Sequence, residues 1–141
     1  MATVRGCEAR LGEWVKGTNP SIVVSTSIAG LEIMGEPGPY NTVKAGLIAY
    51  ASQLGDIAAQ HGIRVNCVSP GPIHVEDGFW GHVKRAQPQA YQQVAERHPM
   101  KRLGTVEEVA KAVVFLSCPV ASWITRTNLI VDGGFSRRVQ F

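Results

Sequence analysis

Apolar residues recur at two different spacings along this chain. Between residues 40 and 61 they return every three or four positions, at Val43, Leu47, Tyr50, Leu54 and Ile57. This period predicts one long amphipathic helix, and Gly62 provides a typical stop signal after it. Residues 3–17 repeat apolar positions with the same helical spacing, so we expect a second, shorter helix there.

Three runs are instead rich in β-branched and apolar residues, as is typical of buried strands: residues 21–27, 63–68 and 128–131. Thr105 and Glu108 form a capping-box pattern, which predicts a helix that continues to about Ser117. Because helices separate these strands, the pattern favours parallel strands joined by crossovers. We therefore expect a layered α/β fold with a narrow sheet.

Residues 73–103 separate the second predicted strand from the capping-box helix, with only a weak helical pattern near residues 87–98. A connection of this length suits a lid or binding segment better than a tight turn. Phe79 and Trp80 lie within it, and two roles stay open for them: stacking on a substrate, or closing the lid. Glu76 and Asp77 are adjacent on a loop, so we expect solvated charges rather than a paired acid.

Composition narrows the class of protein. A hydrophobic content of 45% with 18% charged residues is typical of a soluble globular protein. The net charge of +3 is spread without a long basic run, so it does not indicate a nucleic-acid partner. No apolar run approaches the roughly 18 residues of a membrane span. Three distant cysteines favour reduced thiols and a cytoplasmic location, and four scattered histidines predict no metal site.

The candidate chemistry centres on Tyr40 and Lys44, whose spacing of four places both on one helix face. A neighbouring ammonium favours the phenolate, so the phenol becomes a better proton donor and acceptor near neutral pH. Ser27 ends the first predicted strand, and Pro70-Gly71 follows the second. Parallel sheets bind ligands at these carboxyl ends. An amphipathic helix with an exposed lysine is the alternative, and the serine and the turn make an active site the better interpretation.

Five segments resemble the short-chain dehydrogenase/reductase family in content, order and spacing: residues 22–30 (IVVSTSIAG), 40–45 (YNTVKA), 64–73 (RVNCVSPGPI), 102–110 (RLGTVEEVA) and 129–134 (LIVDGG). The resemblance covers nearly the whole chain from about residue 3. It implies a partial Rossmann-like, doubly wound parallel sheet of about three strands. It also implies one partial domain over residues 1–141, with residues 73–103 as its substrate lid.

The resemblance also implies an activity. A member of this family would transfer hydride between NADP or NAD and a small secondary alcohol or ketone, and would form a homo-oligomer (dimer or tetramer). Tyr40 would be the general acid or base, Lys44 would assist it and bind the nicotinamide ribose, and Ser27 would hold the substrate oxygen. The nicotinamide would be lined by Pro70, Gly71 and Ile73.

Some family features are replaced or missing. Val75 stands where the family often has a threonine, and Arg126 where a glycine usually precedes the last strand. No G-x-x-x-G-x-G motif occurs, so the adenosine half of the cofactor has no cradle. We therefore expect a truncated, split or restarted chain that is inactive alone. The alternative is a non-catalytic module that oligomerises through the helices at 3–17 and 40–61.

Overall fold

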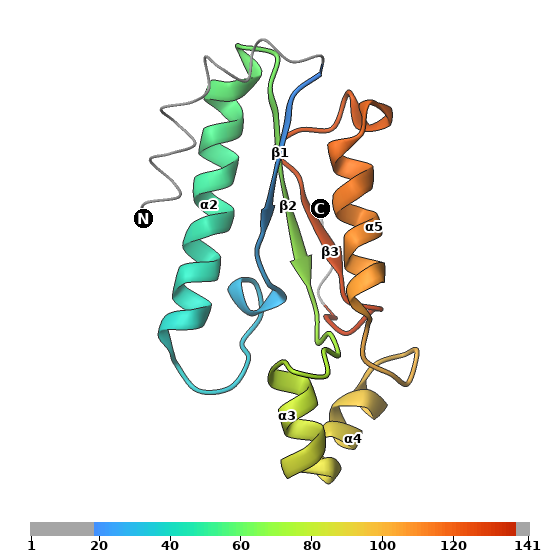
Figure 1. Cartoon of the computed structure of the whole chain (residues 1–141). Coiled ribbons are helices and arrows are strands. Elements are labelled where there is room, and N and C mark those ends of the chain that lie inside the picture. The colour runs from blue at the N-terminus through green and yellow to red at the C-terminus, as the bar shows by residue number, and fades with distance from the viewer. Residues whose placement is uncertain (1–18, 138–141) are drawn as a thin grey trace.

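The computed structural model describes residues 19–137, and the helix expected over residues 3–17 lies outside this range (Figure 1). Two 3-10 turns, η1 (Ile28–Gly30) and η2 (Pro119–Ala121), accompany the longer elements. These elements are, in chain order, β1 (Ser21–Ser25), α2 (Pro39–Ala59), β2 (Arg64–Pro70), α3 (Phe79–Ala86), α4 (Pro88–Arg97), α5 (Val106–Ser117) and β3 (Asn128–Val131). The strand pattern of the sequence is therefore confirmed, although β1 ends two residues before Ser27.

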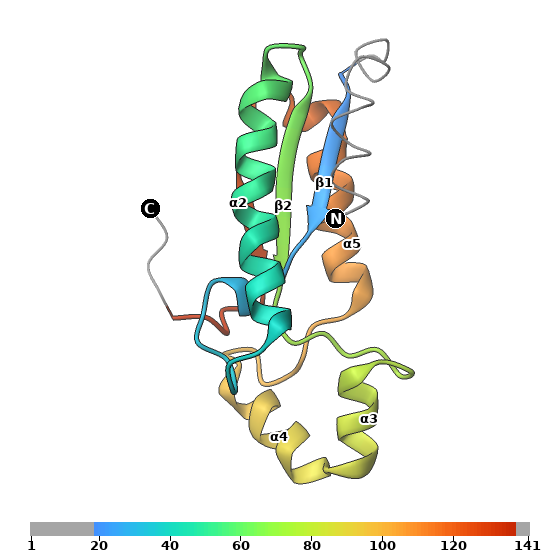
Figure 2. The same ribbon diagram turned by 90° about the vertical axis from the view of Figure 1, so that its left-hand side faces the viewer.

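Within the described residues, the three strands form one parallel sheet in the order β1-β2-β3. Helix α2 covers one face of the sheet and α5 covers the other, as the two views show (Figures 1 and 2). The doubly wound α/β arrangement is thus confirmed. β2 lies in the middle and is buried along nearly all of its length, because helices cover both of its faces.

The core lies between α2 and the sheet. Small and medium side chains let the helix approach β2 closely, and the cluster consists of Ala51, Leu54, Ala58, Ile63, Val65 and Cys67. Val43 and Ile57 belong to the apolar stripe of α2, yet both stay exposed in this chain. Gly62 adopts a positive φ of 72°, which ends the helix segment as its sequence position predicts.

Helix α5 begins with the capping box that the sequence predicts. Thr105 accepts a hydrogen bond from the backbone of Glu108, and the Glu108 carboxylate accepts one from the backbone of Thr105. At the other end, Arg64 is buried and donates to the carbonyl oxygens of Leu116 at 2.7 Å and Cys118 at 3.2 Å. A cation at the carboxyl end of a helix satisfies its unpaired carbonyl groups and its dipole. Sequence analysis did not single out Arg64.

Residues 73–103 contain two helices, α3 and α4, where the sequence pattern indicated only one weak helix. They lie beyond the carboxyl ends of the strands and pack against each other (Figure 2). The Trp80 and Tyr91 rings meet edge to face, with centroids 6.4 Å apart. Within residues 19–137, no helix combines the length and the apolar character that crossing a bilayer requires.

Candidate active site

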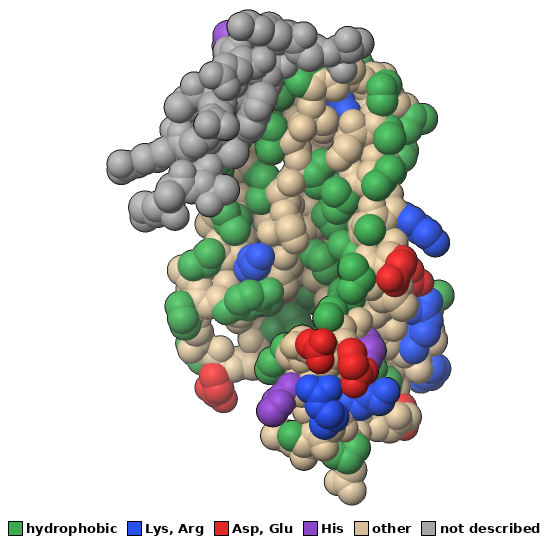
Figure 3. Space-filling model, viewed as in Figure 1, with side chains coloured by type: hydrophobic (Ala, Val, Ile, Leu, Met, Phe, Trp, Pro, Cys, Tyr) green, Lys and Arg blue, Asp and Glu red, His purple; other side chains and the backbone are tan. Residues whose placement is uncertain are grey.

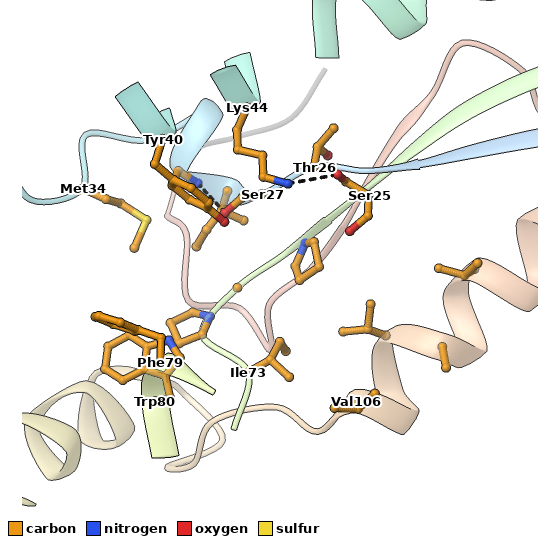
Figure 4. Close-up of a pocket in the computed structure, with 18 of the residues that line it drawn as sticks. Ser25, Thr26, Ser27, Met34, Tyr40, Lys44, Ile73, Phe79, Trp80 and Val106 are labelled. Carbon is orange, nitrogen blue, oxygen red and sulfur yellow. Dashed lines mark hydrogen bonds between the residues drawn. The ribbon is translucent and has the colours of Figure 1, made fainter. Parts of the chain in front are cut away.

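A large cavity opens at the carboxyl ends of β1 and β2. Its volume is about 930 Å³, and its walls come from α2, α3, α5 and the loops after the strands. Figure 4 shows how these walls face one another, and Figure 3 shows apolar side chains gathered in the hollow between α2 and α5. Every residue that the sequence proposed for the site lines this cavity: Ser27, Tyr40, Lys44, Pro70, Gly71 and Ile73.

Tyr40 and Lys44 enter the cavity from the first turns of α2, which starts at Pro39. The Lys44 ammonium lies 5.7 Å from the centroid of the Tyr40 ring. Lys44 Nζ also donates a hydrogen bond to the carbonyl oxygen of Ser25 at 3.1 Å, which fixes the ammonium at the end of β1. Tyr40 is 58% exposed, and its ring is directed toward Ser27 in Figure 4. The helix spacing therefore delivers a phenol and an ammonium to the same wall.

Ser27 lies just beyond β1 and caps the η1 turn. Its Oγ accepts a hydrogen bond from the backbone N–H of Ala29 at 3.2 Å. A hydroxyl that accepts in this way keeps its own proton for donation to another oxygen. The expected strand end is therefore a cap of a 3-10 turn, and this turn directs the hydroxyl into the cavity.

Gly30 allows η1 to pack directly on α2. A Cβ on Gly30 would lie 2.7 Å from the backbone nitrogen of Ala45 and 2.8 Å from the carbonyl carbon of Lys44. Both contacts are too short for a real side chain, so the turn that carries Ser27 needs glycine here. The absence of a side chain thus brings Ser27 close to the helix that carries Tyr40 and Lys44.

The Pro70–Ile73 wall is held from two sides. Gly71 donates to the carbonyl oxygen of Val131 at 3.0 Å, and a Cβ on Gly71 would meet the Cβ of Asp132 at 2.6 Å. Further along, Ile73 and Gly104 form an isolated parallel bridge. β3 and the loop before α5 therefore fix the position of this wall.

A buried hydroxyl network, missed by the sequence analysis, joins the three strands below the cavity. Thr26 Oγ1 and Ser69 Oγ lie 2.7 Å apart, and Ser69 Oγ donates to Asn128 Oδ1 at 2.8 Å. The Thr26 hydroxyl proton is shared between Ser69 Oγ and the carbonyl oxygen of Val68, which lies 2.8 Å from Thr26 Oγ1. The only sequence signal was a small polar residue at the carboxyl end of each of the first two strands and another at the start of the third. The network ties the ends of β1 and β2, which support the site, to the start of β3.

The two departures from the family pattern lie outside this cavity. Val75 is 43% exposed and does not line it. Arg126 adopts a left-handed φ of 60°, a conformation that glycine reaches without strain. Its guanidinium pairs with Asp56 at 2.8 Å on the surface. Arg126 therefore replaces the family glycine at a backbone cost and leaves the site undisturbed.

Residues 73–103 contribute both aromatic and charged groups. Phe79 and Trp80 line the cavity opposite Tyr40 (Figure 4), a position compatible with both roles left open for them. Glu76 is exposed, and the pKa of its carboxyl is lowered, first by a hydrogen bond with His74 and further by the charge of Arg85. Within residues 19–137, no group of three or more His, Cys, Asp or Glu side chains is arranged to hold a metal ion.

Known proteins share both this sequence and this fold. Residues 2–136 match the family model described as enoyl-(acyl carrier protein) reductase. The chain is 36% identical over 127 residues to isoepoxydon dehydrogenase patN of Penicillium expansum, covering 89% of this chain and 49% of that protein. It is 34% identical over 134 residues to the 3-oxoacyl-[acyl-carrier-protein] reductase FabG of Chlamydia muridarum, covering 92% and 50% respectively.

Solved structures agree with this assignment. A 3-oxoacyl-[acyl-carrier protein] reductase from Brucella melitensis with bound NAD superposes with a TM-score of 0.76 at 26% identity, covering 96% of this chain and 47% of that chain. ElxO with NADP bound gives 0.78 at 28% identity, covering 92% and 50%. The chain therefore belongs to the short-chain dehydrogenase/reductase family. It spans about half the length of the curated relatives it matches.

Proposed function

We propose that this chain is the catalytic half of an NAD(P)-dependent oxidoreductase that acts on a small secondary alcohol or ketone. The observation that carries the proposal is the shared cavity, in which a phenol, an ammonium and a serine hydroxyl face one apolar space. The relatives named as reductases and dehydrogenases support the same class of reaction. Residues 73–103 would act as the substrate lid.

In this proposal the proton chemistry belongs to Tyr40. The phenol donates its proton to the substrate oxygen during reduction, or accepts one during oxidation. The Lys44 ammonium lies 5.7 Å from the ring centroid, on the same wall of the cavity as the phenol. Ser27 donates its hydroxyl proton to the same oxygen and orients the carbonyl group. When bound, the nicotinamide supplies or accepts the hydride.

The residues of the cavity fit the nicotinamide half of NADP or NAD. The fixed wall of Pro70, Gly71 and Ile73 offers an apolar face to a nicotinamide ring, and Lys44 offers ammonium donors to ribose hydroxyls. The chain has no G-x-x-x-G-x-G motif to hold a pyrophosphate. We therefore propose that the 141-residue chain alone does not turn over substrate.

Complementation tests this function. The purified chain is assayed for oxidation of NADPH and NADH with a panel of ketones, alone and mixed with the separately produced amino-terminal half of Chlamydia muridarum FabG. We expect no turnover alone and turnover in the mixture, which Tyr40→Phe lowers by roughly 100-fold or more because it removes the acid. Turnover by the chain alone contradicts its inactivity. Turnover in the mixture that Tyr40→Phe leaves unchanged contradicts the catalytic role.

A non-catalytic module that oligomerises is the second candidate. Val43 and Ile57 lie on one face of α2 and are 58% and 52% exposed, so the apolar stripe continues beyond what the sheet covers. The helix expected over residues 3–17 would share that interface. Light scattering tests the idea: Val43→Lys combined with Ile57→Lys should convert an oligomer to a monomer, whereas Ala49→Lys, at an exposed position of the same helix that is turned away from both, should not. A wild-type monomer excludes this candidate.

A further inference from the structure

A second cavity adjoins the first on the side of the lid. Its volume is about 400 Å³, and it is bounded by the loop after η1, by α4 and by the segment after β3. Three residues line both cavities: Met34, Pro72 and Trp80. Figure 4 shows Met34 and Trp80 beside Tyr40 and Phe79, at one end of the first cavity. A ligand that reaches past these apolar side chains passes from the candidate catalytic wall into the second cavity.

The second cavity differs from the first in its charge. Arg97 from α4 and Arg137 line it, and Glu32 is the one acidic residue among its lining residues in the described chain. The described lining residues therefore carry one net positive charge, from two arginines and one glutamate. Within residues 19–137, neither arginine takes part in a salt bridge. A ligand that enters from the first cavity therefore passes apolar side chains before it reaches two arginines.

Arg97 is held in place by an aromatic platform. Its guanidinium carbon lies 4.9 Å from the centroid of the Phe135 ring, and the His98 ring lies 4.5 Å from the same ring. A guanidinium stacked on a ring keeps the N–H donors at its edge available for oxygen ligands. Stacking therefore positions Arg97 without consuming its donors.

The platform itself is anchored by the turn after β3. The Asp132 carboxylate accepts hydrogen bonds from the backbone of Gly134 at 2.9 Å and from the Ser136 hydroxyl at 2.6 Å. Burial opposes ionisation of this carboxyl, yet the hydrogen bonds from Ser136 and Gly134 hold its pKa below the ordinary value. Because Phe135 lies inside this fixed turn, its ring is a stable support for Arg97.

We propose that the substrate carries a carboxylate at the far end of an apolar chain, and that Arg97, assisted by Arg137, binds this carboxylate in the second cavity. The reacting carbon would lie at Tyr40, and the chain would run past Met34 and Trp80. Only the placement of the reacting carbon at Tyr40 rests on the proposed function. The binding of the carboxylate by Arg97 does not depend on it. A singly charged carboxylate matches the net charge of the described lining residues, whereas a doubly charged phosphate exceeds it.

A binding experiment on the 141-residue chain tests the proposal. Isothermal titration calorimetry compares methyl-ketone carboxylic acids of increasing chain length, beginning with levulinic acid, with their methyl esters. At the chain length that spans both cavities, we expect the acid to bind about fivefold more tightly than its ester, the upper end of what an accessible ion pair contributes. Raising the ionic strength should reduce this ratio.

Substitutions test whether Arg97 causes the preference for the acid over its ester. Arg97→Gln should bring the acid-to-ester ratio to about one, and Lys111→Gln, which removes the same charge from α5 outside the cavity, should preserve it. Tyr40→Phe should also preserve the ratio, so a failure of the catalytic proposal is distinguishable from a failure of this one. Equal binding of acid and ester at every length, no binding of either, or a preference that Arg97→Gln retains would overturn the proposal.

Discussion

At the scale of single residues, the missing side chain of Gly30 allows the turn that carries Ser27 to lie against α2. Gly30 lets the backbone of η1 touch the backbone of α2 at Lys44 and Ala45. Ser27 caps the same turn, and Tyr40 stands one helical turn before Lys44. A larger residue at position 30 would therefore move η1 relative to α2 and change the separation between the Ser27 hydroxyl and the Tyr40 phenol.

Gly30→Ala should destabilise the fold by about 1–3 kcal/mol, because the new Cβ would overlap backbone atoms that cannot rotate away. Urea denaturation followed by circular dichroism measures the change. Gly46→Ala is the matched control: nothing lies within 4 Å of its Cβ position, and it lies inside α2. That control should gain about 0.5–1 kcal/mol from helix propensity. Equal effects of the two substitutions would disprove the close-contact argument.

At this scale, the sequence predicts which residues lie together when their proximity depends on local spacing. Tyr40 and Lys44 are separated by one helical turn, so their common wall follows from the helix period alone. Arg64 could not be predicted in the same way. Its guanidinium is buried because carbonyl groups from Leu116 and Cys118, more than fifty residues away, surround it. The sequence around residue 64 does not indicate those partners.

At the scale of elements, the start of α5 depends on a cluster of charged hydrogen bonds. The Glu108 carboxylate accepts from Arg102 at 2.6 Å and 2.8 Å, and from the backbone of Thr105 at 2.9 Å. These donors, Arg102 first, lower the pKa of Glu108 from 4.5 to about 2. The helix that closes one side of the cavity thus begins at a carboxylate that stays ionised in acid.

Stability should therefore fall as the pH is lowered from about 4.5 to about 2. In this window the unfolded chain binds a proton at Glu108 that the folded chain does not yet bind, so protonation favours unfolding. Urea midpoints measured across the window test this. Glu108→Gln should flatten the dependence, and Glu96→Gln on α4 should not. An unchanged slope in Glu108→Gln would refute the role assigned to this carboxylate.

The elements also show where periodicity is insufficient. The capping box and the strand at Asn128–Val131 were predicted with correct bounds, since both signals are contained in a few consecutive residues. Helix α3 was missed. Gly81 is buried there against the backbone of Glu76 and Val75, so packing of the loop supports this short helix. In α5, Leu116 is buried, whereas Val109 and Val113 line the cavity.

At the scale of the whole molecule, the reactivity of the Cys67 thiol shows whether the chain is folded. It lies in β2, in the core between α2 and the sheet, and burial raises the pKa of its thiol to about 11. Because the thiolate is the reactive form, a thiol with this pKa is nearly inert at neutral pH. Cys118 is less buried and lies after α5.

Iodoacetamide at neutral pH should modify Cys118 readily and Cys67 only when the chain unfolds. Mass spectrometry of the peptides, measured over a urea series, should show Cys67 labelling that follows the loss of helical signal. The Cys118 peptide is the internal control. Rapid labelling of Cys67 without urea would contradict the burial of β2.

The sequence by itself determined the order of the three strands and of helices α2 and α5, the parallel sheet and the common wall of Tyr40 and Lys44. Each of these follows from interactions within a few residues or from the period of one element. Only the tertiary structure decided how Gly30 sets the distance between η1 and α2, why Arg64 is buried, and that Arg97 stands at a second cavity beside Trp80. Those features join residues far apart in the chain, whose proximity arises only when the layers pack.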